Sequence, residues 1–179
     1  MKLIPTQIPE VKILQTEQFF DKRGFFSEVF SKKFLDVSFV QDNESYSTYG
    51  VLRGLHYQRP PFAQAKLVRC VKGSILDVVV DIRKGSPTFR KNVSVVLSDE
   101  NRLQLFVPKG FAHGFVVLSP DALVHYKCDE YYHPEAAEGI QPLDPSLGID
   151  WIITETDMTI KDDDLRSPCL DDCTLHFNL

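Results

Sequence analysis

A histidine and a lysine in two neighbouring apolar segments could act together on a bound molecule. Residues 50–58 alternate apolar and other side chains with a period of two, which is typical of a β-strand. This period places His56 on one face and Arg53 on the other, unless the strand contains a bulge. Lys66 begins a second strand pattern, residues 66–71. Imidazole suits proton transfer near neutral pH, and an ammonium suits stabilisation of a developing oxyanion.

Both residues also have an ordinary structural explanation. His56 could be a half-buried strand histidine with satisfied hydrogen bonds, and Lys66 could extend its charged end into solvent from an apolar stem. Proton transfer by His56 would also need a carboxylate that orients the imidazole and stabilises its cationic form. The residue pattern cannot select that carboxylate from 25 Asp and Glu residues, so both explanations stay open.

Two more candidate residues lie later in the chain, in strand-like segments. His113 is followed directly by a glycine, and glycine in a strand allows close approach of a ligand or of another backbone. Tyr126 lies in the next strand pattern. Taken alone, His113 is better explained as a core imidazole bonded to a carbonyl. Tyr126 is better explained as a packed phenol with one hydrogen bond.

The histidine spacing argues against a bound metal. Small β-barrels that hold a metal usually present two histidines one residue apart, a carboxylate and a later histidine. Here Gln58 takes the position two residues after His56, and the other histidines are dispersed. Cys169 and Cys173 lack partners at zinc-site spacing. We therefore expect no metal and no cofactor.

Length and composition limit the possible classes of protein. The 179 residues suggest one domain spanning 1–179, and a hydrophobic fraction of 43% with 13 Phe residues can fill a core. The net charge of -5, without a Lys/Arg run, argues against nucleic-acid or membrane partners. No segment resembles a signal peptide, and four Cys are too few for a disulfide scaffold, so we expect a cytoplasmic protein.

The order of patterns predicts an all-β chain. Apolar runs recur every 8–12 residues or so between Gly, Pro, Asn and Asp turns, as in a sandwich or barrel. In residues 74–82, Asp77 and Asp81 share a face with Ile75 and Val79. A short helix is expected over 31–35 and one or two helical turns within 157–164. Strands are expected over 11–16, 38–43, 51–58, 66–71, 74–82, 93–97, 103–107, 111–118 and 123–128.

From about residue 5 to residue 170, the sequence resembles the dTDP-4-dehydrorhamnose 3,5-epimerase family. Many motifs occur in the family's order and spacing, whereas one motif alone would not be specific. The motifs are Asp21-Lys-Arg-Gly-Phe-Phe, Phe39-Val-Gln-Asp-Asn, Gly50-Val-Leu-Arg-Gly-Leu-His-Tyr-Gln, Lys66-Leu-Val-Arg, Asp77-Val-Val-Val-Asp-Ile-Arg-Lys-Gly-Ser-Pro-Thr-Phe, Pro108-Lys-Gly-Phe-Ala-His-Gly-Phe and Tyr126-Lys-Cys-Asp-Glu-Tyr-Tyr-His-Pro.

The resemblance implies a cupin-type jelly roll with an N-terminal strand arm and a short helical or irregular tail. It also implies a homodimer with an exchanged N-terminal strand, and conversion of dTDP-4-dehydro-6-deoxy-glucose to dTDP-4-dehydro-rhamnose without a metal. By motif, His56 matches the general base, Tyr126 the general acid, Lys66 the lysine near the sugar's C4 oxygen, and Asp164 the carboxylate that pairs with the base. The positions that match substrate contacts are Arg23, Phe26, Glu28, Gln41, Asp42, Asn43, Arg53, His113 and Glu138.

Two alternatives remain beside this interpretation, and one position departs from the family pattern. A 3- or 5-monoepimerase, or a 3,4-ketoisomerase, would use the same kind of substrate. A non-catalytic sugar-binding module would keep its affinity after His56→Ala. Asp163 stands where the family commonly has a lysine before the paired aspartate, and Lys161 lies two positions earlier.

Overall fold

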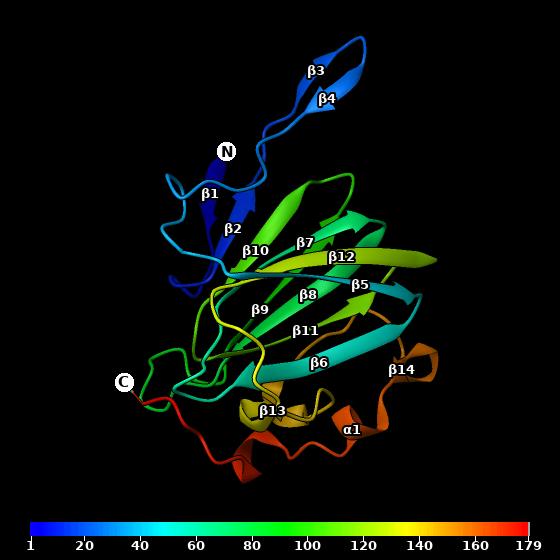
Figure 1. Cartoon of the computed structure of the whole chain (residues 1–179). Coiled ribbons are helices and arrows are strands. Elements are labelled where there is room, and N and C mark those ends of the chain that lie inside the picture. Colours follow the sequence, from blue (N-terminus) through cyan, green and yellow to red (C-terminus); the bar gives the residue numbers. More distant parts are fainter. Residues whose placement is uncertain (179) are drawn as a thin grey trace.

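The protein is built from two β-sheets that face each other and one separate hairpin (Figure 1). This computed structural model describes residues 1–178. The first sheet has the order β1-β2-β10-β7-β12-β5, and the second has the order β13-β6-β11-β8-β9, with β14 beside β6. The strands are β1 (Lys2–Pro5), β2 (Lys12–Gln15), β3 (Phe19–Asp21), β4 (Gly24–Phe26), β5 (Gln41–Thr48), β6 (Val51–Gln58), β7 (Lys66–Lys72), β8 (Ser74–Asp81), β9 (Asn92–Ser98), β10 (Leu103–Val107), β11 (Phe111–Val117), β12 (Asp121–Cys128), β13 (Ala137–Gly139) and β14 (Thr159–Ile160).

The main core lies between the two sheets and follows from strand alternation. Ile75 and Val79 of β8 pack there against Val68 of β7 and Val124 of β12. Asp77, between Ile75 and Val79, therefore also faces inward. The two faces predicted for residues 74–82 are confirmed, because Leu76, Val78, Val80 and Ile82 belong to a different cluster.

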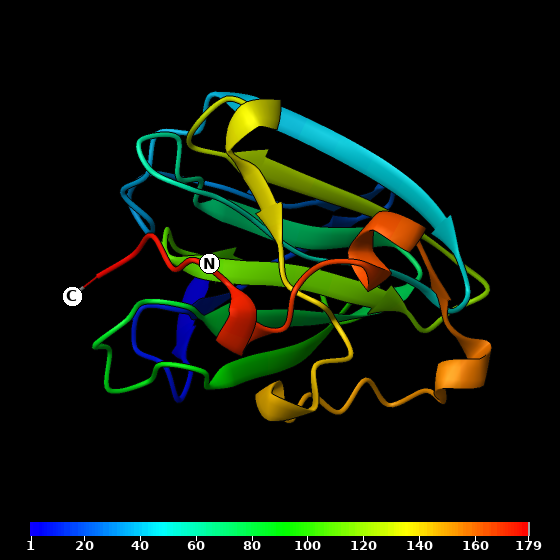
Figure 2. The same ribbon diagram turned by 90° about the horizontal axis from the view of Figure 1, so that it is seen from below.

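A segment outside the sheets covers the outer face of each one. The tail after β12 covers the second sheet, where Trp151, Ile140 and Leu170 pack against β6, β8 and β11. In Figure 2 this tail, coloured from yellow through orange to red, lies in front of the second sheet. Residues 30–39 cover part of the first sheet and pack Leu35 against Leu67 and Phe106. Both coverings bury apolar side chains that would otherwise face water.

Two predicted elements differ from the structure, one in its type and one in its bounds. Residues 31–35 form a turn, with Leu35 N donating to Ser31 O, instead of a helix. The strand expected over 38–43 is β5, which begins at Gln41 and continues to Thr48 because it pairs with β12 along its whole length. The predicted helical turn in the tail is α1 (Asp162–Leu165). Within residues 1–178, no helix has the length and apolar character needed to cross a membrane.

Candidate active site

A bulge in β6 turns Arg53 and His56 toward the same face of the sheet. His56 pairs with His113, whereas Arg53 pairs with Phe115, so three steps along β6 match two steps along β11. The extra residue reverses the alternation between the two positions. Arg53 therefore faces the first sheet, where its Nε donates to Ser47 Oγ of β5 at 3.0 Å. Regular alternation without a bulge would place Arg53 and His56 on opposite faces, and a bulge is the exception to this prediction.

Glycine is required at the bulge because two backbones approach each other there. Gly54 has φ +129°, and a Cβ atom at this position would lie 2.5 Å from Gly114 Cα and 2.8 Å from His113 O. A Cβ on Gly114 would in turn lie 2.7 Å from Arg53 O. The two glycines thus permit the close approach of the paired strands β6 and β11 at the bulge that orients His56.

His56 forms a close pair with Asp164 of the C-terminal helix α1. The His56 Nε2 and Asp164 Oδ1 atoms are 2.8 Å apart, and Asp164 Oδ2 accepts a hydrogen bond from Gly54 N at 3.2 Å. Asp164 is buried, whereas the His56 side chain is 49% exposed. Burial alone would raise the pKa of Asp164, but the hydrogen bond and charge of His56, and the bond from Gly54, hold it below its usual value.

This pairing fixes which ring nitrogen of His56 can act as a base. When Nε2 carries the proton that is donated to Asp164, Nδ1 carries the free lone pair. The half-exposed ring leaves that nitrogen available to a ligand. An ionised aspartate on the other nitrogen stabilises the imidazolium that forms after proton uptake.

Asp163, at the position where the family commonly has lysine, lies outside this arrangement. Its carboxylate is exposed and is bound by Lys161 at 2.5 Å and by Arg166 at 2.7 Å. Lys161 therefore makes a surface ion pair, although its charge contributes to the lowered pKa of Asp164. The choice of Asp164 as the carboxylate beside His56 agrees with this geometry.

Lys66 and Tyr126 lie near each other on the inner face of the first sheet. Lys66 Nζ is 6.0 Å from the centre of the Tyr126 ring. Within residues 1–178, no hydrogen bond or ion pair engages this ammonium. Desolvation lowers the pKa of Lys66, partly offset by Cys128 and Asp77. Desolvation also raises the pKa of Tyr126, reinforced by Cys128 and opposed by the charge of Arg53.

A second histidine–aspartate pair, which is fully buried, lies beside the first, because His113 of β11 is paired with His56 of β6. His113 Nε2 lies 2.7 Å from Asp77 Oδ1, and both side chains are buried. The other oxygen, Asp77 Oδ2, is buried and has no hydrogen-bond partner among the described residues. The negative charge of Asp77 also opposes the lowering of the Lys66 pKa. Asp77 was not among the predicted site residues; its inward position in an apolar strand was the available signal.

The predicted contacts on β5 divide between the two faces of the first sheet. Gln41 Nε2 donates to Asn43 Oδ1 at 3.0 Å, and Asn43 Nδ2 donates to Cys128 Sγ at 3.7 Å. Asp42, between them, faces outward and pairs with Lys127 at 2.9 Å. Because side chains alternate along a strand, Asp42 lies on the outer face, opposite to Gln41 and Asn43. The resemblance had grouped all three as substrate contacts, and the structure corrects this for Asp42.

Glu138 is also held on the side of its sheet away from His56. In β13 it stands opposite Tyr57 of β6, whose hydroxyl donates to Glu138 Oε2 at 2.6 Å. Arg59 and His176 lie 3.5 Å and 3.3 Å from Glu138 Oε1. Tyr57 belongs to the apolar cluster under the C-terminal tail. The structure therefore does not bring Glu138 to the face that carries His56.

Arg23 and Phe26 lie on the β3–β4 hairpin, which projects from the barrel (Figure 1). Phe26 is 70% exposed, and Arg23 pairs with Asp21 of the same turn at 2.6 Å. Glu28, just after the hairpin, is exposed as well. None of these three contacts the His56 side of its own chain. Within residues 1–178, no cluster of three or more His, Cys, Asp or Glu residues is arranged to hold a metal ion.

Comparisons with known proteins agree over almost the whole chain. A family model described as dTDP-4-dehydrorhamnose 3,5-epimerase matches residues 5–172. The epimerase of that name from Shigella flexneri is 51% identical over 168 residues, which cover 90% of this chain and 93% of the relative. A 3,5-epimerase from Legionella pneumophila, solved with dTDP-4-keto-L-rhamnose, is 46% identical with a TM-score of 0.94 and covers 99% and 98% of the two chains.

A relative that is named for a different activity has the same fold. A 3'-monoepimerase from Streptomyces bikiniensis, solved with dTDP-quinovose, is 34% identical with a TM-score of 0.86, and the match covers 93% of this chain and 87% of that one. These likenesses confirm the predicted cupin-type β fold. On the match of its family model and the identity of its relatives, the chain belongs to the dTDP-4-dehydrorhamnose 3,5-epimerase family.

Proposed function

We propose that the protein epimerises dTDP-4-dehydro-6-deoxy-glucose at C3 and C5, giving dTDP-4-dehydro-rhamnose for dTDP-rhamnose biosynthesis. The observation that carries this proposal is the His56–Asp164 pair, with its 2.8 Å contact and free Nδ1. Hydrogens on the carbons that flank the C4 ketone are acidic because the resulting carbanion delocalises onto oxygen. One base and one oxyanion contact therefore serve both centres, and no cofactor is required.

In this mechanism, His56 Nδ1 removes the proton from C3 or C5. Asp164 keeps the other ring nitrogen protonated and stabilises the imidazolium. A positioned base contributes about 10²–10⁴-fold to such a reaction. The lowered pKa of Asp164 supports this role, because the carboxylate stays ionised throughout the neutral range.

Lys66 stabilises the enolate oxygen that forms at C4. The Lys66 side chain is half-buried and its pKa is lowered by desolvation, and a charge interaction is stronger in such a place than in bulk solvent. Within residues 1–178, no carboxylate is ion-paired with Lys66, so its hydrogen bonds are available to a ligand. A preorganised contact of this kind is worth about 10²–10³-fold.

Tyr126 returns a proton to the face of the sugar opposite His56, which inverts the centre. Burial raises the pKa of its phenol, so the group is protonated at neutral pH and can act as an acid. After donation the phenolate is stabilised by Arg53, whose charge favours the ionised form. Solvent then restores the phenol and removes the proton from His56, which prepares both residues for the second centre.

We also propose a homodimer in which the β3–β4 hairpin supplies Arg23, Phe26 and Glu28 to the partner's nucleotide site. The exposure of four phenylalanines on one hairpin supports this assembly, since apolar surface of this kind marks interaction sites. Phe26 would stack on the thymine and Arg23 would pair with the diphosphate. We place the protein in the cytoplasm, a location that its four free cysteines support.

Deuterium incorporation tests the reaction. Incubated with the 4-keto sugar nucleotide in D₂O, the protein is expected to introduce deuterium at both C3 and C5 of the product. Label at one carbon only would make the protein a monoepimerase, as the Streptomyces bikiniensis relative is named. Absence of label at both carbons would contradict proton transfer by His56.

A further inference from the structure

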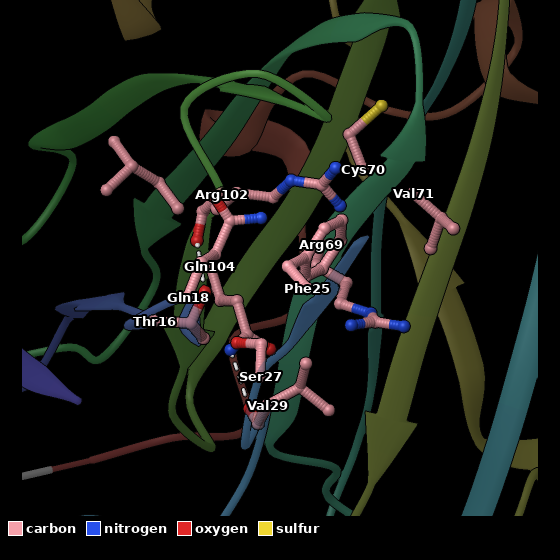
Figure 3. Close-up of a pocket in the computed structure, with 11 residues that line it drawn as sticks. Thr16, Gln18, Phe25, Ser27, Val29, Arg69, Cys70, Val71, Arg102 and Gln104 are labelled. Atoms are coloured by element: carbon pink, nitrogen blue, oxygen red, sulfur yellow. Dashed lines mark hydrogen bonds between the residues drawn. The ribbon is translucent and has the colours of Figure 1, made fainter. Parts of the chain in front are cut away.

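A cavity of about 190 Å³ lies beneath the base of the β3–β4 hairpin, on the outer face of the first sheet. Figure 3 shows its lining, which comes from β7, β10 and the segment that contains the hairpin. Lys66 and Arg69 belong to the same strand, but alternation sends Lys66 inward and Arg69 outward into this lining. The cavity is therefore separated from the candidate active site by the sheet itself.

Two arginines, Arg69 and Arg102, border the cavity. Within residues 1–178, no carboxylate forms an ion pair with Arg69 or Arg102. Arg69 Nε is buried and has no hydrogen-bond partner in the described chain. The charge of Glu44 opposes the lowering of the Arg69 pKa. However, Glu44 of β5 and Arg69 of β7 are paired with opposite sides of His125 in β12, so this strand lies between them. Burial and the neighbouring charge of Arg102 both lower the pKa of Arg69, so the two cations disfavour each other.

The walls of the cavity are held in place by hydrogen bonds. Gln104 Nε2 donates to Val29 O at 2.6 Å, and Ser27 Oγ donates to Glu17 O at 2.7 Å. The Arg102 guanidinium lies over the Phe25 ring, with Cζ 4.9 Å from its centre. These contacts fix the hairpin base against β10 and leave the guanidinium groups of Arg69 and Arg102 as the charged donors.

We propose that this cavity binds a small oxyanion, a carboxylate or a phosphate, between Arg69 and Arg102. A buried guanidinium donor without a partner is costly, and an oxyanion supplies both the missing acceptor and the missing negative charge. The anion would tie the hairpin segment to β7 and β10. Its source is either a free anion or a carboxylate of a second copy of this chain. The site does not depend on the proposed epimerase activity.

Calorimetric titration with inorganic phosphate, at constant ionic strength set by chloride, tests the site. Wild type is expected to bind one phosphate per chain. Arg69→Gln and Arg102→Gln should each weaken binding by about tenfold or more, the loss of one charge-assisted hydrogen bond. Lys84→Gln removes an exposed positive charge elsewhere and should leave binding unchanged. Circular dichroism of each variant separates a lost site from a lost fold.

The concentration dependence of the oligomeric state distinguishes the two sources. If phosphate does not bind and both arginine variants weaken self-association by tenfold or more relative to Lys84→Gln, the oxyanion is a carboxylate of the second copy. If phosphate binds to wild type and both folded variants with equal affinity, the site is overturned. It is also overturned if phosphate does not bind and both variants self-associate as wild type does.

Discussion

Asp164 reaches His56 from a single turn of helix in the C-terminal tail, with 2.8 Å between the carboxylate oxygen and the imidazole nitrogen. The same carboxylate accepts a hydrogen bond from Gly54 in the β6 bulge. The Asp164 side chain thus stabilises both the position of the His56 ring and the β6 bulge that directs this ring toward the first sheet. The tail contributes to the candidate active site in addition to covering the second sheet.

Asp164→Asn should lower kcat by about 10²-fold or more, because the neutral amide cannot stabilise the His56 imidazolium. Asp163→Asn is the matched control one residue earlier, since that carboxylate pairs only with surface cations, and it should leave kcat unchanged. Steady-state kinetics of the two variants makes the comparison. Equal loss in both variants would contradict a specific pairing with His56.

The Asp164 carboxylate should also stabilise the fold in a pH-dependent way. Its pKa is lower in the folded protein than in the unfolded chain, so its contribution is fully present above about pH 4, the usual Asp value. That contribution is lost as pH falls through the folded pKa. Urea unfolding of wild type and Asp164→Asn should therefore give a stability difference that shrinks below about pH 4. A difference that grows on acidification would contradict the lowered pKa.

The fall in kcat at alkaline pH, the alkaline limb of the rate profile, should result from deprotonation of Lys66 and not of Tyr126. Burial lowers the pKa of Lys66 and raises that of Tyr126, and we therefore expect the ammonium to lose its proton first as pH rises. Tyr126→Phe should reduce kcat and keep the limb below about pH 10.4, the ordinary lysine value. Lys66→Arg should move the limb of the remaining activity to higher pH. A limb that disappears in Tyr126→Phe would reverse the assignment.

Gly54→Ala should cost about 3 kcal/mol or more in the free energy of unfolding and abolish activity. Its Cβ would lie 2.5 Å from Gly114 Cα, and the backbone has φ +129°. Gly148 also has positive φ, +57°, but a Cβ there meets nothing within 4 Å. Gly148→Ala should therefore cost only about 1 kcal/mol. Chemical denaturation compares the two variants, and equal costs would show that the close backbone approach is unimportant.

Mixed dimers test whether the hairpin completes the partner's site. Arg23→Ala and His56→Ala should each be nearly inactive alone. When co-expressed and isolated as a mixed dimer through two different tags, they should regain up to about half of the wild-type rate, because one of the two sites then contains both native residues. No recovery in a verified mixed dimer would place Arg23 in the site of its own chain or outside any site.

Strand alternation predicted much of the fold because it is a local property. The all-β pattern, the two faces of residues 74–82 and the helical turn near Asp164 followed from periodicity and turn residues. Alternation could not predict the bulge at Gly54, because the bulge arises from the close approach of β11. From the sequence, a bulge could be named only as the exception that would change the face of Arg53. Alternation also predicts that Asp42 faces away from Gln41 and Asn43, as the structure has it.

Other features of the site depend on contacts between distant segments. The pairing of His56 with Asp164 spans 108 residues, and periodicity carries no signal for it. The network of Glu138 with Tyr57, Arg59 and His176 is equally non-local. The direction of the β3–β4 hairpin depends on packing beyond its own turn. Family resemblance selected Asp164, but it also grouped Glu138 with residues that face the other way.

Solvent exchange in two variants tests the central claim most directly, which is that His56 removes the proton and Tyr126 returns it to the opposite face. NMR in D₂O can follow deuterium at C3 and C5 together with the appearance of the inverted sugar. Tyr126→Phe should incorporate deuterium faster than it inverts the centre, because His56 returns a solvent deuteron to the original face. His56→Ala should do neither. Exchange retained in His56→Ala and abolished in Tyr126→Phe would contradict the assignment of base and acid.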